Sequence, residues 1–208
     1  MPIIETSAAV LALAAILGYL LGSIPFGMIL ARVMGLGNLR EIGSGNIGAT
    51  NVLRTGNKTA AALTLILDGG KGAVAVLIAH ALWGEGAAQI AGLAAFLGHC
   101  YPVWLKFAGG KGVATYLGIM LALNPIIGLA ACGTWLAFAV LLRYSSLAAL
   151  MAAGFAPVWM VILSRDTTFI LGVVLAILIY WRHRANVARL RVGSEPKIGQ
   201  KKSPKTGA

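Results

Sequence analysis

Charged residues are scarce in this sequence, and acidic residues are the scarcest of them. A soluble globular domain has about 25% charged residues, whereas this chain of 208 residues has 11% and only 6 Asp or Glu. Hydrophobic residues make up 59% of the chain, and its mean hydropathy is +0.85. The composition excludes a soluble domain and indicates an integral membrane protein.

Cysteine is almost absent as well. Cys100 and Cys132 lie in apolar or interfacial stretches, without CxxC or histidine spacing. We therefore expect two buried free thiols, no disulfide and no metal site.

The net charge of +11 could suggest nucleic acid, but there is no soluble basic domain and the aromatic residues fall mainly within apolar runs. The positive charge is better explained by the positive-inside rule, so no nucleic acid partner is expected.

Long apolar segments are abundant, and they predict an all-α polytopic membrane protein with seven transmembrane helices. Pro25 is expected to kink the first helix, and Asn124-Pro125 should divide a long apolar run into a hairpin of two short spans. The predicted spans cover residues 6–33, 59–83, 87–105, 145–163 and 167–181, and two short spans divide the apolar run that follows Lys111 and ends at Leu142.

The distribution of basic residues predicts the orientation of these helices. The turn at Arg165-Asp166 is expected on the outer side, and Arg165 is the one basic residue of 17 that falls there. This asymmetry predicts an outer N-terminus and a cytoplasmic C-terminus. We expect one transmembrane domain over residues 1–192, followed at 193–208 by a basic, disordered cytoplasmic tail.

A polar, glycine-rich segment interrupts the apolar sequence at residues 43–54, which read GSGNIGATNVLR. Glycines allow backbone N–H groups to turn inward, while hydroxyl and amide side chains add neutral donors and an arginine adds a permanent charge. Such a run is also typical of a plain turn between two helices. Facing the cytoplasm, it favours phosphate binding, with the candidate residues Ser44, Gly45, Asn46, Thr50, Asn51 and Arg54.

The sequence Asp68-Gly69-Gly70-Lys71-Gly72 interrupts the second apolar run. Because two adjacent glycines weaken a helix, we expect a break here that places Lys71 at the cytoplasmic interface as a phosphate ligand. The alternative is a lysine that snorkels to the interface and pairs with Asp68, since residues three apart share one helix face.

The tetrapeptide Gly-Gly-Lys-Gly occurs at residues 69–72 and again at 109–112. A nucleotide P-loop is excluded because glycine, instead of Ser or Thr, follows each lysine. A lysine flanked by glycines at a helix start nevertheless suits phosphate, because free N–H groups and the helix dipole add to its charge. The second copy contributes the candidate phosphate ligands Gly109, Gly110, Lys111, Gly112 and Thr115, with His99 shortly before it.

The last apolar span is followed by Arg182-His183-Arg184-Ala185-Asn186. We expect His183 and Asn186 to project from one face of a continuing helix, because they are three residues apart. The neighbouring arginines would meet lipid headgroups or substrate phosphate. Alone, this segment is more typical of the basic flank that follows a membrane span.

Taken together, four separated motifs resemble the bacterial acyl-phosphate:glycerol-3-phosphate acyltransferases of the PlsY type. They are the 43–54 segment, Asp68-x-x-Lys71-Gly72, Gly98-His99-x-x-Pro102 with residues 109–115, and Arg182-His183-x-x-Asn186. The resemblance implies a membrane enzyme that transfers a fatty acyl group from acyl phosphate to the 1-hydroxyl of sn-glycerol 3-phosphate. The products would be lysophosphatidic acid and phosphate, in the first step of phospholipid biosynthesis at the bacterial inner membrane.

The resemblance also implies roles for individual residues. Ser44, Arg54 and Lys111 would bind phosphate, and His183 with Asn186 would lie at the reacting centre, with Asp68 and His99 in support. We count Ser44, Lys111, His183 and Asn186 as catalytic. His183 is either a general base or a group that orients the glycerol hydroxyl while the leaving phosphate takes the proton; the second is favoured. No cofactor and no obligate protein partner are expected, only the two substrates and membrane lipid.

The sequence also bears on two other functions. An acyltransferase of the HxxxxD class needs a histidine and an aspartate five residues apart, but His80 is followed at that distance by Glu85, on the outer side. A transporter for an organic phosphate would also use broken helices, glycines and basic groups. Against transport, the motifs gather on one membrane face and the sequence shows no evident two-half symmetry.

Overall fold

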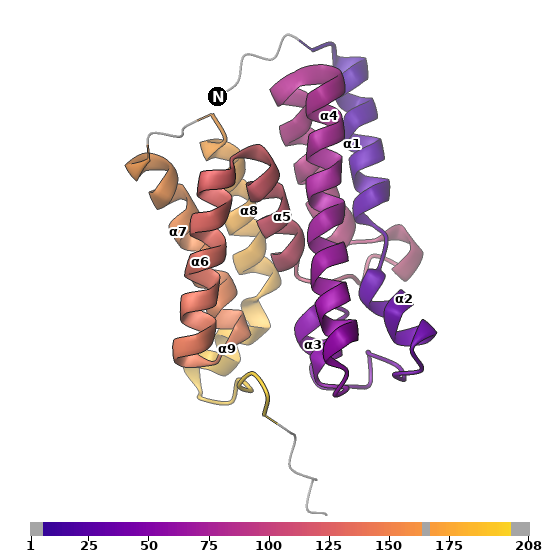
Figure 1. Ribbon diagram of the computed structural model, residues 1–208, viewed down its shortest axis with the longest axis vertical. Helices are drawn as coiled ribbons and strands as arrows, with labels where there is room; N and C mark the ends of the chain where they lie inside the picture. The colour runs from indigo at the N-terminus through magenta and orange to yellow at the C-terminus, as the bar shows by residue number, and fades with distance from the viewer. Residues whose placement is uncertain (1–5, 164–166, 201–208) are drawn as a thin grey trace, which may run out of the picture.

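All regular elements in the part of the chain that the structure describes, residues 6–163 and 167–200 of a computed structural model, are helices (Figure 1). They are α1 (Ala8–Gly22), α2 (Phe26–Val33), α3 (Ala49–Leu53), α4 (Lys58–Cys100), the 3₁₀ helix η1 (Val103–Leu105), α5 (Val113–Leu123), α6 (Pro125–Leu142), α7 (Ser145–Ile162), α8 (Phe169–Arg182) and α9 (Arg184–Arg191). The predicted all-α class is confirmed.

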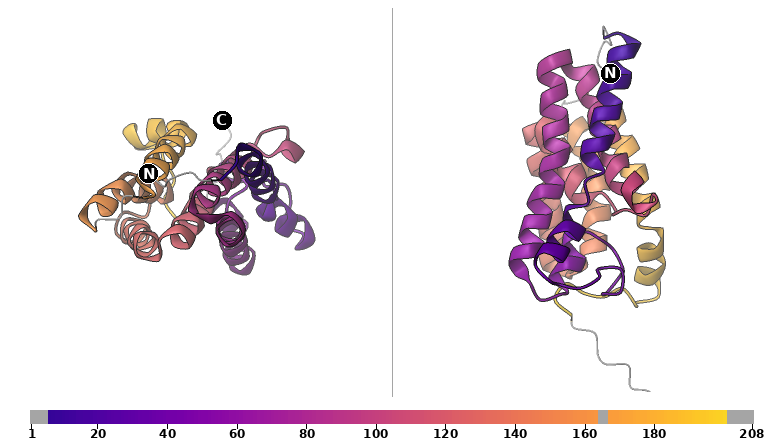
Figure 2. Two further views of the ribbon diagram at one scale, coloured as in Figure 1. Left: turned by 90° about the horizontal axis from the view of Figure 1, so that it is seen from above. Right: turned by 90° about the vertical axis from the view of Figure 1, so that its right-hand side faces the viewer.

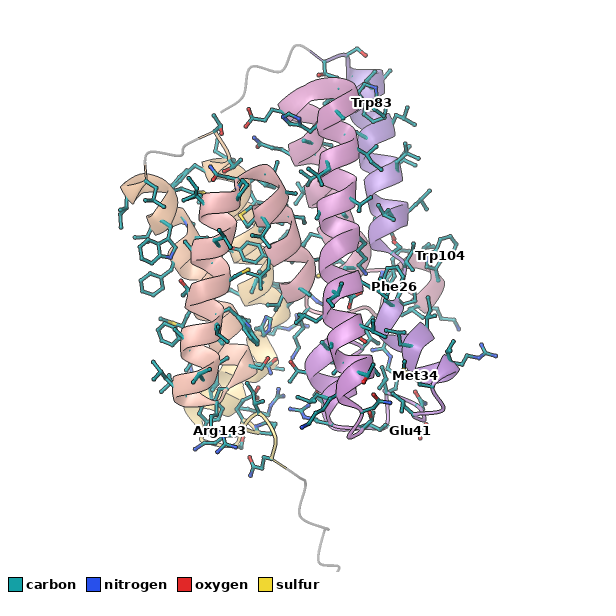
Figure 3. All side chains as sticks on the ribbon, viewed as in Figure 1. Phe26, Met34, Glu41, Trp83, Trp104 and Arg143 are labelled. Carbon is teal, nitrogen blue, oxygen red and sulfur yellow. The ribbon has the colours of Figure 1, made fainter. Side chains whose placement is uncertain are left out.

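The helices form an elongated bundle with two sides. α1 to α4 lie on one side and α6 to α9 on the other, and α5 lies between them, packed against both α4 and α6 (Figures 1 and 2). Trp83 lies at one end of the bundle, and Glu41 and Arg143 lie at the opposite end (Figure 3). We call these the Trp83 end and the Arg143 end.

Pro25 separates α1 from α2, as the sequence predicts. The ring of proline removes a backbone donor, so a helix that meets it leaves carbonyl groups without partners. Beside this break, the carbonyl of Ile24 accepts a hydrogen bond from Nζ of Lys71 at 2.8 Å. The break in the first span is therefore joined to the middle of α4.

α4 is a helical hairpin, because its backbone reverses at Gly84, where φ is 80° and ψ is −174°. The positive φ explains the need for glycine at this position. In a straight helix residues 68 and 99 would lie about 46 Å apart, yet Nδ1 of His99 lies 3.7 Å from Oδ1 of Asp68. The predicted turn at residues 83–86 is confirmed, and the first arm of α4 ends at Trp83.

The predicted helix break at residues 69–72 is wrong. α4 continues through this segment, and its glycines instead bring α4 and α5 close together. A Cβ atom at Gly72 would lie 2.7 Å from the carbonyl oxygen of Thr115, and one at Gly118 would lie 2.0 Å from that of Gly69. The small residues serve helix packing, a use that depends on the partner helix.

We expect Gly72→Ala to destabilise the protein, because the added methyl group has no room between α4 and α5. The overpacking cost should be about 1–3 kcal/mol, seen as a lower midpoint of thermal unfolding in detergent. Gly70→Ala is the matched control, since a Cβ there meets nothing within 4 Å. Because alanine favours helix, this control should unfold at the same or a higher temperature. Equal losses in both variants would contradict the packing role.

The later helices follow the predicted pattern up to α8. The hairpin at Asn124-Pro125 is confirmed, with the Asn124 side chain accepting hydrogen bonds from the N–H groups of Ile126 and Ile127 at the start of α6. α7 and α8 match the predicted spans at 145–163 and 167–181. The predicted turn at Arg165-Asp166 includes residues outside the described ones.

The prediction of a continuing helix through His183 and Asn186 is wrong. α8 ends at Arg182, and α9 begins at Arg184 after a bend of 61°. Residues 193–200, which we expected to begin the tail, pack back on the bundle: the N–H of Ile198 donates to the carbonyl of Arg143 at 2.6 Å. Residues 201–208 are outside the described part.

Among residues 6–163 and 167–200, four segments are long and apolar enough to cross a membrane, or five if the bent pair α8 and α9 is counted as one span. They are α1 with α2 (26 residues), α4 with η1 (48 residues), α6 and α7. α5 is a shorter apolar helix. Many large apolar side chains on these helices are exposed, for example Leu129 at 65% and Val161 at 68%, as expected for a surface that meets lipid.

Candidate active site

Asn51 holds the glycine-rich loop of residues 43–54 in shape. Its Oδ1 atom accepts hydrogen bonds from the N–H and the hydroxyl of Ser44, at 3.0 and 3.3 Å, and from Nη1 of Arg54 at 3.2 Å. Its Nδ2 atom donates to the carbonyl of Leu39 at 3.0 Å. Asn51 is buried, so it positions Ser44 and Arg54 and does not itself face outward.

The other residues of this loop make contacts and hydrogen bonds within the protein. Gly43 has a φ of 56°, and a Cβ there would lie 2.5 Å from Oδ1 of Asn51, so only glycine fits this position. Oδ1 of Asn46 accepts from the N–H of Gly48 at 2.9 Å, just before α3. The hydroxyl of Thr50 is hydrogen-bonded to that of Ser145 at the start of α7, at 2.9 Å. The loop is thereby joined to the other side of the bundle.

Arg40 connects this loop to the segment before the Gly-Gly-Lys-Gly motif. Its guanidinium donates to the carbonyl of Gly45 at 3.3 Å and also to the carbonyl of Ala108. Two motifs that are about sixty residues apart in the chain are therefore neighbours. Arg40 was not among the predicted site residues, because its neighbours in the sequence do not show which carbonyls it reaches.

The two glycines before Lys111 do not offer their N–H groups to a ligand. The N–H of Gly109 donates to the backbone carbonyl of Cys100 at 3.2 Å, and the N–H of Gly110 donates to the backbone carbonyl of His99 at 3.0 Å. Gly112 has a φ of 83° and immediately precedes α5. The N–H groups that remain for an anion are those of the first turn of α5, where the helix dipole favours negative charge.

Lys111 contacts Asn186 directly across the bundle. Its Nζ atom donates to Oδ1 of Asn186 at 2.5 Å, while Nδ2 of Asn186 donates to Oε1 of Glu195 at 2.6 Å. The amide of Asn186 is therefore fixed at both ends. Because an ammonium group has three N–H donors, Lys111 keeps others for an anion after it has bound Asn186.

Glu195 is a residue of the candidate site that was not predicted from the sequence. Besides Asn186, its carboxylate accepts from the hydroxyl of Ser146 at 2.6 Å and from Nε of Arg189 at 2.7 Å. Burial raises the pKa of Glu195, but the hydrogen bonds from Ser146, Asn186 and Arg189 hold this pKa below its ordinary value. The available signal was that Glu195 is the only acid in the basic segment 193–208.

His183 is buried at the junction of α8 and α9. Its Nδ1 atom lies 2.8 Å from the carbonyl oxygen of Ile179. Since a carbonyl oxygen only accepts, Nδ1 carries a hydrogen, and in the neutral ring Nε2 bears the free lone pair. This geometry leaves Nε2 as the atom that can accept a hydrogen bond from a hydroxyl group.

The charges around Lys111 make this region strongly basic. Burial lowers the pKa of Lys111 to about 8, with Glu195 acting to raise it and Arg189, Arg54 and Arg182 acting to lower it. Arg54 also has a lowered pKa, first because of burial, then through opposing effects of Glu195 and Arg189. Three arginines and a lysine thus lie in the region of one carboxylate, and this excess of positive charge suits an anionic ligand.

Four of the predicted site residues lie instead in a buried cluster between α4 and α5. Nζ of Lys71 is 3.0 Å from Oδ1 of Asp68, and His99 lies beside the same carboxylate. The hydroxyl of Thr115 donates to the backbone carbonyl of Asp68 at 2.8 Å. The prediction that Lys71 reaches the interface is wrong, because its ammonium is buried. The alternative, a snorkelling lysine paired with Asp68, is correct in the pairing and wrong in the snorkelling.

The structure therefore brings together some of the predicted residues and separates others. Through Asn51 and the charges around Lys111, it collects Ser44, Arg54, Lys111, His183 and Asn186 toward the Arg143 end of the bundle. The supporting cluster behind Gly110 consists of Lys71, Thr115, Asp68 and His99. It lies close to Gly110, because a Cβ atom added there would be 2.0 Å from Nε2 of His99.

No group of three or more His, Cys, Asp or Glu residues that could hold a metal ion is found in residues 6–163 and 167–200. Cys100 is buried and free, and Cys132 is half-buried and free. The polar groups of the candidate site are instead cations, hydroxyls and amides, which bind anions.

These observations define the class: an all-helical membrane protein with a basic centre that suits an anion. The family model described as glycerol-3-phosphate acyltransferase matches residues 12–193, and this chain belongs to that family. The glycerol-3-phosphate acyltransferase of Roseobacter denitrificans is 64% identical over 96% of this chain and 100% of its own length. That of Ruegeria pomeroyi is 63% identical over 97% and 99%.

The fold is also similar to solved structures. A crystal structure of PlsY (YgiH), an integral membrane glycerol 3-phosphate acyltransferase, in its glycerol 3-phosphate form, matches with a TM-score of 0.86 and 40% identity over 91% of this chain and 96% of that one. Its lysophosphatidic acid form matches with a TM-score of 0.82 and 37% identity, over 91% and 95%. The resemblance noted from the four motifs is confirmed, and with it a membrane location.

Proposed function

We propose that this protein transfers a fatty acyl group from acyl phosphate to the 1-hydroxyl of sn-glycerol 3-phosphate, producing lysophosphatidic acid and phosphate. The observation that carries this proposal is the contact between Lys111 and Asn186, 2.5 Å long, beside buried His183 and within the basic surroundings described above. Both substrates carry phosphate, so a centre with several cations and one acid is what they require. The reaction opens phospholipid biosynthesis.

The chemistry needs no covalent intermediate on the protein. The 1-hydroxyl oxygen attacks the acyl carbonyl carbon and forms the new ester bond, while the bond between that carbon and the phosphate oxygen breaks. Phosphate leaves with the electron pair and takes up the hydroxyl proton. Because acyl phosphate is a mixed anhydride that is already activated, orientation and charge stabilisation supply the catalysis without a cofactor.

The phosphate groups and the developing charge are met by Lys111, Arg54 and Ser44. Lys111 combines its charge with the free N–H groups at the start of α5, and Arg54 and Ser44 present a cation and a hydroxyl that Asn51 holds together. Nε2 of His183 accepts a hydrogen bond from the 1-hydroxyl and thereby aims its oxygen at the acyl carbon.

Asn186 acts on Lys111. Its amide oxygen directs the ammonium, and its amide nitrogen is anchored on Glu195. The other candidate residues support the two loops: Gly45, Asn46, Thr50 and Asn51 shape the first loop, and Gly109, Gly110, Gly112, Thr115, Lys71, Asp68 and His99 shape and back the second.

We infer seven crossings of the bacterial inner membrane, with the N-terminus outside and the active site facing the cytoplasm. Counting α1 with α2 as one span, the two arms of α4 as two, and α5, α6, α7 and α8 as one each gives this number. Arg40 and Arg54 contact the first loop of the site, Arg189 contacts Glu195, and Arg143 contacts the segment after α9, and this concentration of basic residues supports the orientation. Membrane lipid surrounds the apolar faces.

The test uses purified protein in detergent, acyl phosphate and labelled glycerol 3-phosphate. We expect labelled lysophosphatidic acid to form, and acyl-CoA in place of acyl phosphate to give no product. Absence of product, together with uptake of the label into sealed proteoliposomes, would replace the enzyme with a transporter for an organic phosphate.

The activity should fall as the pH rises through about 8. Lys111 binds phosphate when it is protonated, and burial lowers its pKa to about 8, so the cation is present below this pH and is lost above it. The measurement is kcat/KM for glycerol 3-phosphate from pH 6 to pH 10. Glu195→Gln should move the alkaline limb of this profile, the fall in kcat/KM at high pH, to lower pH, because the Glu195 charge raises the pKa of Lys111. An unmoved limb in this variant would contradict the assignment to Lys111.

A further inference from the structure

Arg182 is bound to the backbone of the Gly109-Gly110 segment. Its Nε and Nη2 atoms donate to the carbonyl oxygen of Gly110 at 3.1 and 2.8 Å, and Nη2 also lies 3.4 Å from the carbonyl oxygen of Gly109. The flat face of the guanidinium lies over Tyr101, with Cζ 4.8 Å from the ring centroid. Arg182 is half-buried, and these contacts hold it in one orientation.

These contacts fix the peptide groups of the loop from both sides. The N–H groups of Gly109 and Gly110 donate to the carbonyls that end α4, while their carbonyl oxygens point at Arg182. Tyr101, the platform for the guanidinium, is itself held to α1, because its carbonyl accepts from the hydroxyl of Tyr19 at 2.7 Å. Little freedom is left to the loop that precedes Lys111.

The same two segments meet at a second point. Lys111 follows Gly110 directly and binds Asn186, while His183 follows Arg182 directly and lies between Arg182 and Asn186 in the chain. We propose that Arg182 is a positioning residue, which sets the distance between the Lys111 ammonium and the His183 ring by clamping the Gly109-Gly110 carbonyls to the end of α8. This inference rests on the proposed acyl transfer, in which Lys111 and His183 act on the same pair of substrates.

Lysine cannot replace arginine in this clamp. A guanidinium donates from its edge to two carbonyls while its face stacks on an aromatic ring, whereas an ammonium is a single point of charge. Arg182→Lys therefore keeps the positive charge and loses the geometry. Arg182→Gln loses both. Comparing the two separates positioning from a purely electrostatic effect on substrate phosphate.

The experiment measures kcat and KM for both substrates in Arg182→Lys and Arg182→Gln. A displacement of about 1 Å costs about 10²-fold in rate, so we expect Arg182→Lys to lower kcat by about 10–100-fold while KM for glycerol 3-phosphate changes by less than about 3-fold. Arg184→Lys and Arg184→Gln are the matched controls. Arg184 is exposed, stacks on Trp181 at 4.8 Å, and should be replaceable without loss of activity.

The pH profile gives a readout that a merely structural role would not move. The Arg182 charge is one of those that lower the pKa of Lys111. Arg182→Gln should therefore shift the alkaline limb to higher pH, while Arg182→Lys should leave it in place despite the lower kcat. Both variants are checked by thermal unfolding and size-exclusion chromatography in detergent.

Two results would overturn the proposal. One is a wild-type kcat in Arg182→Lys. The other is a loss confined to KM for a phosphate-bearing substrate, which would make Arg182 a phosphate ligand. If Arg182→Lys does not fold, Tyr101→Leu removes the aromatic platform alone and should still lower kcat with KM retained; an unchanged kcat there would equally overturn it. Absence of lysophosphatidic acid from the wild-type protein would instead refute the proposed function itself.

Discussion

Lys111→Ala is expected to lower kcat/KM for glycerol 3-phosphate by about 10³-fold, because removal of one preorganised donor to a developing negative charge costs about 10²–10³-fold. Lys111 is also the group that joins the start of α5 to Asn186 on α9. Lys111→Arg keeps the charge, but the larger guanidinium cannot contact both Asn186 and the substrate phosphate in the same space. This variant should therefore recover only part of the activity.

The control for this loss is Lys58→Ala. Lys58 is an exposed lysine at the start of α4, and its replacement should leave kcat/KM within about 2-fold, since surface charges away from the reacting groups contribute little. Equal effects at Lys58 and Lys111 would show that the protein needs positive charge in general. Unchanged activity in Lys111→Ala would remove Lys111 from the site.

His183→Ala is expected to lower kcat by about 10²-fold with KM for glycerol 3-phosphate nearly unchanged. In the proposed reaction Nε2 of His183 orients the hydroxyl while the leaving phosphate takes the proton, so the loss is one of orientation. The buried ring is held through Nδ1 by the carbonyl of Ile179, which leaves no second role for that nitrogen.

His183→Asn is the companion variant, because its amide retains hydrogen-bonding capacity but cannot act as a base near neutral pH. It should be more active than His183→Ala. General base catalysis contributes about 10²–10⁴-fold, so a loss near the upper value in both variants, with substrate binding intact, would make His183 the base and contradict proton transfer to phosphate.

Features of the fold that depend on local chemistry could be predicted from the sequence. Pro25 removes a donor wherever it stands, so the break after α1 follows from the residue itself. The same is true of the hairpin at Asn124-Pro125, where asparagine caps the following helix. Gly84 reverses α4 within the predicted turn.

The continuous helix through Asp68 and Lys71 could not be predicted in this way. Gly69 and Gly72 weaken a helix when it is considered alone, but in the bundle they allow α5 to approach, and Lys71 gains a partner in Asp68 and another in the Ile24 carbonyl. Tertiary packing therefore overrides the local propensity.

The candidate site was predictable in its residue types and less so in its contacts. The motifs identified Lys111, His183 and Asn186, but the spacing of His183 and Asn186 assumed a straight helix, whereas α8 and α9 meet at 61°. Glu195 lies in a segment whose composition resembles a tail. Its burial is explained by its contacts with Asn186 and Arg189 on α9 and with Ser146, which is 49 residues away in the sequence.

The most direct test of direct acyl transfer is a single-turnover measurement with doubly labelled acyl phosphate, labelled in both its acyl chain and its phosphate. With glycerol 3-phosphate present, phosphate and lysophosphatidic acid should appear at the same rate and in a ratio of one to one, with no acyl label on the protein. Release of phosphate ahead of lysophosphatidic acid, with the acyl label retained on the protein, would contradict the account and require a covalent intermediate.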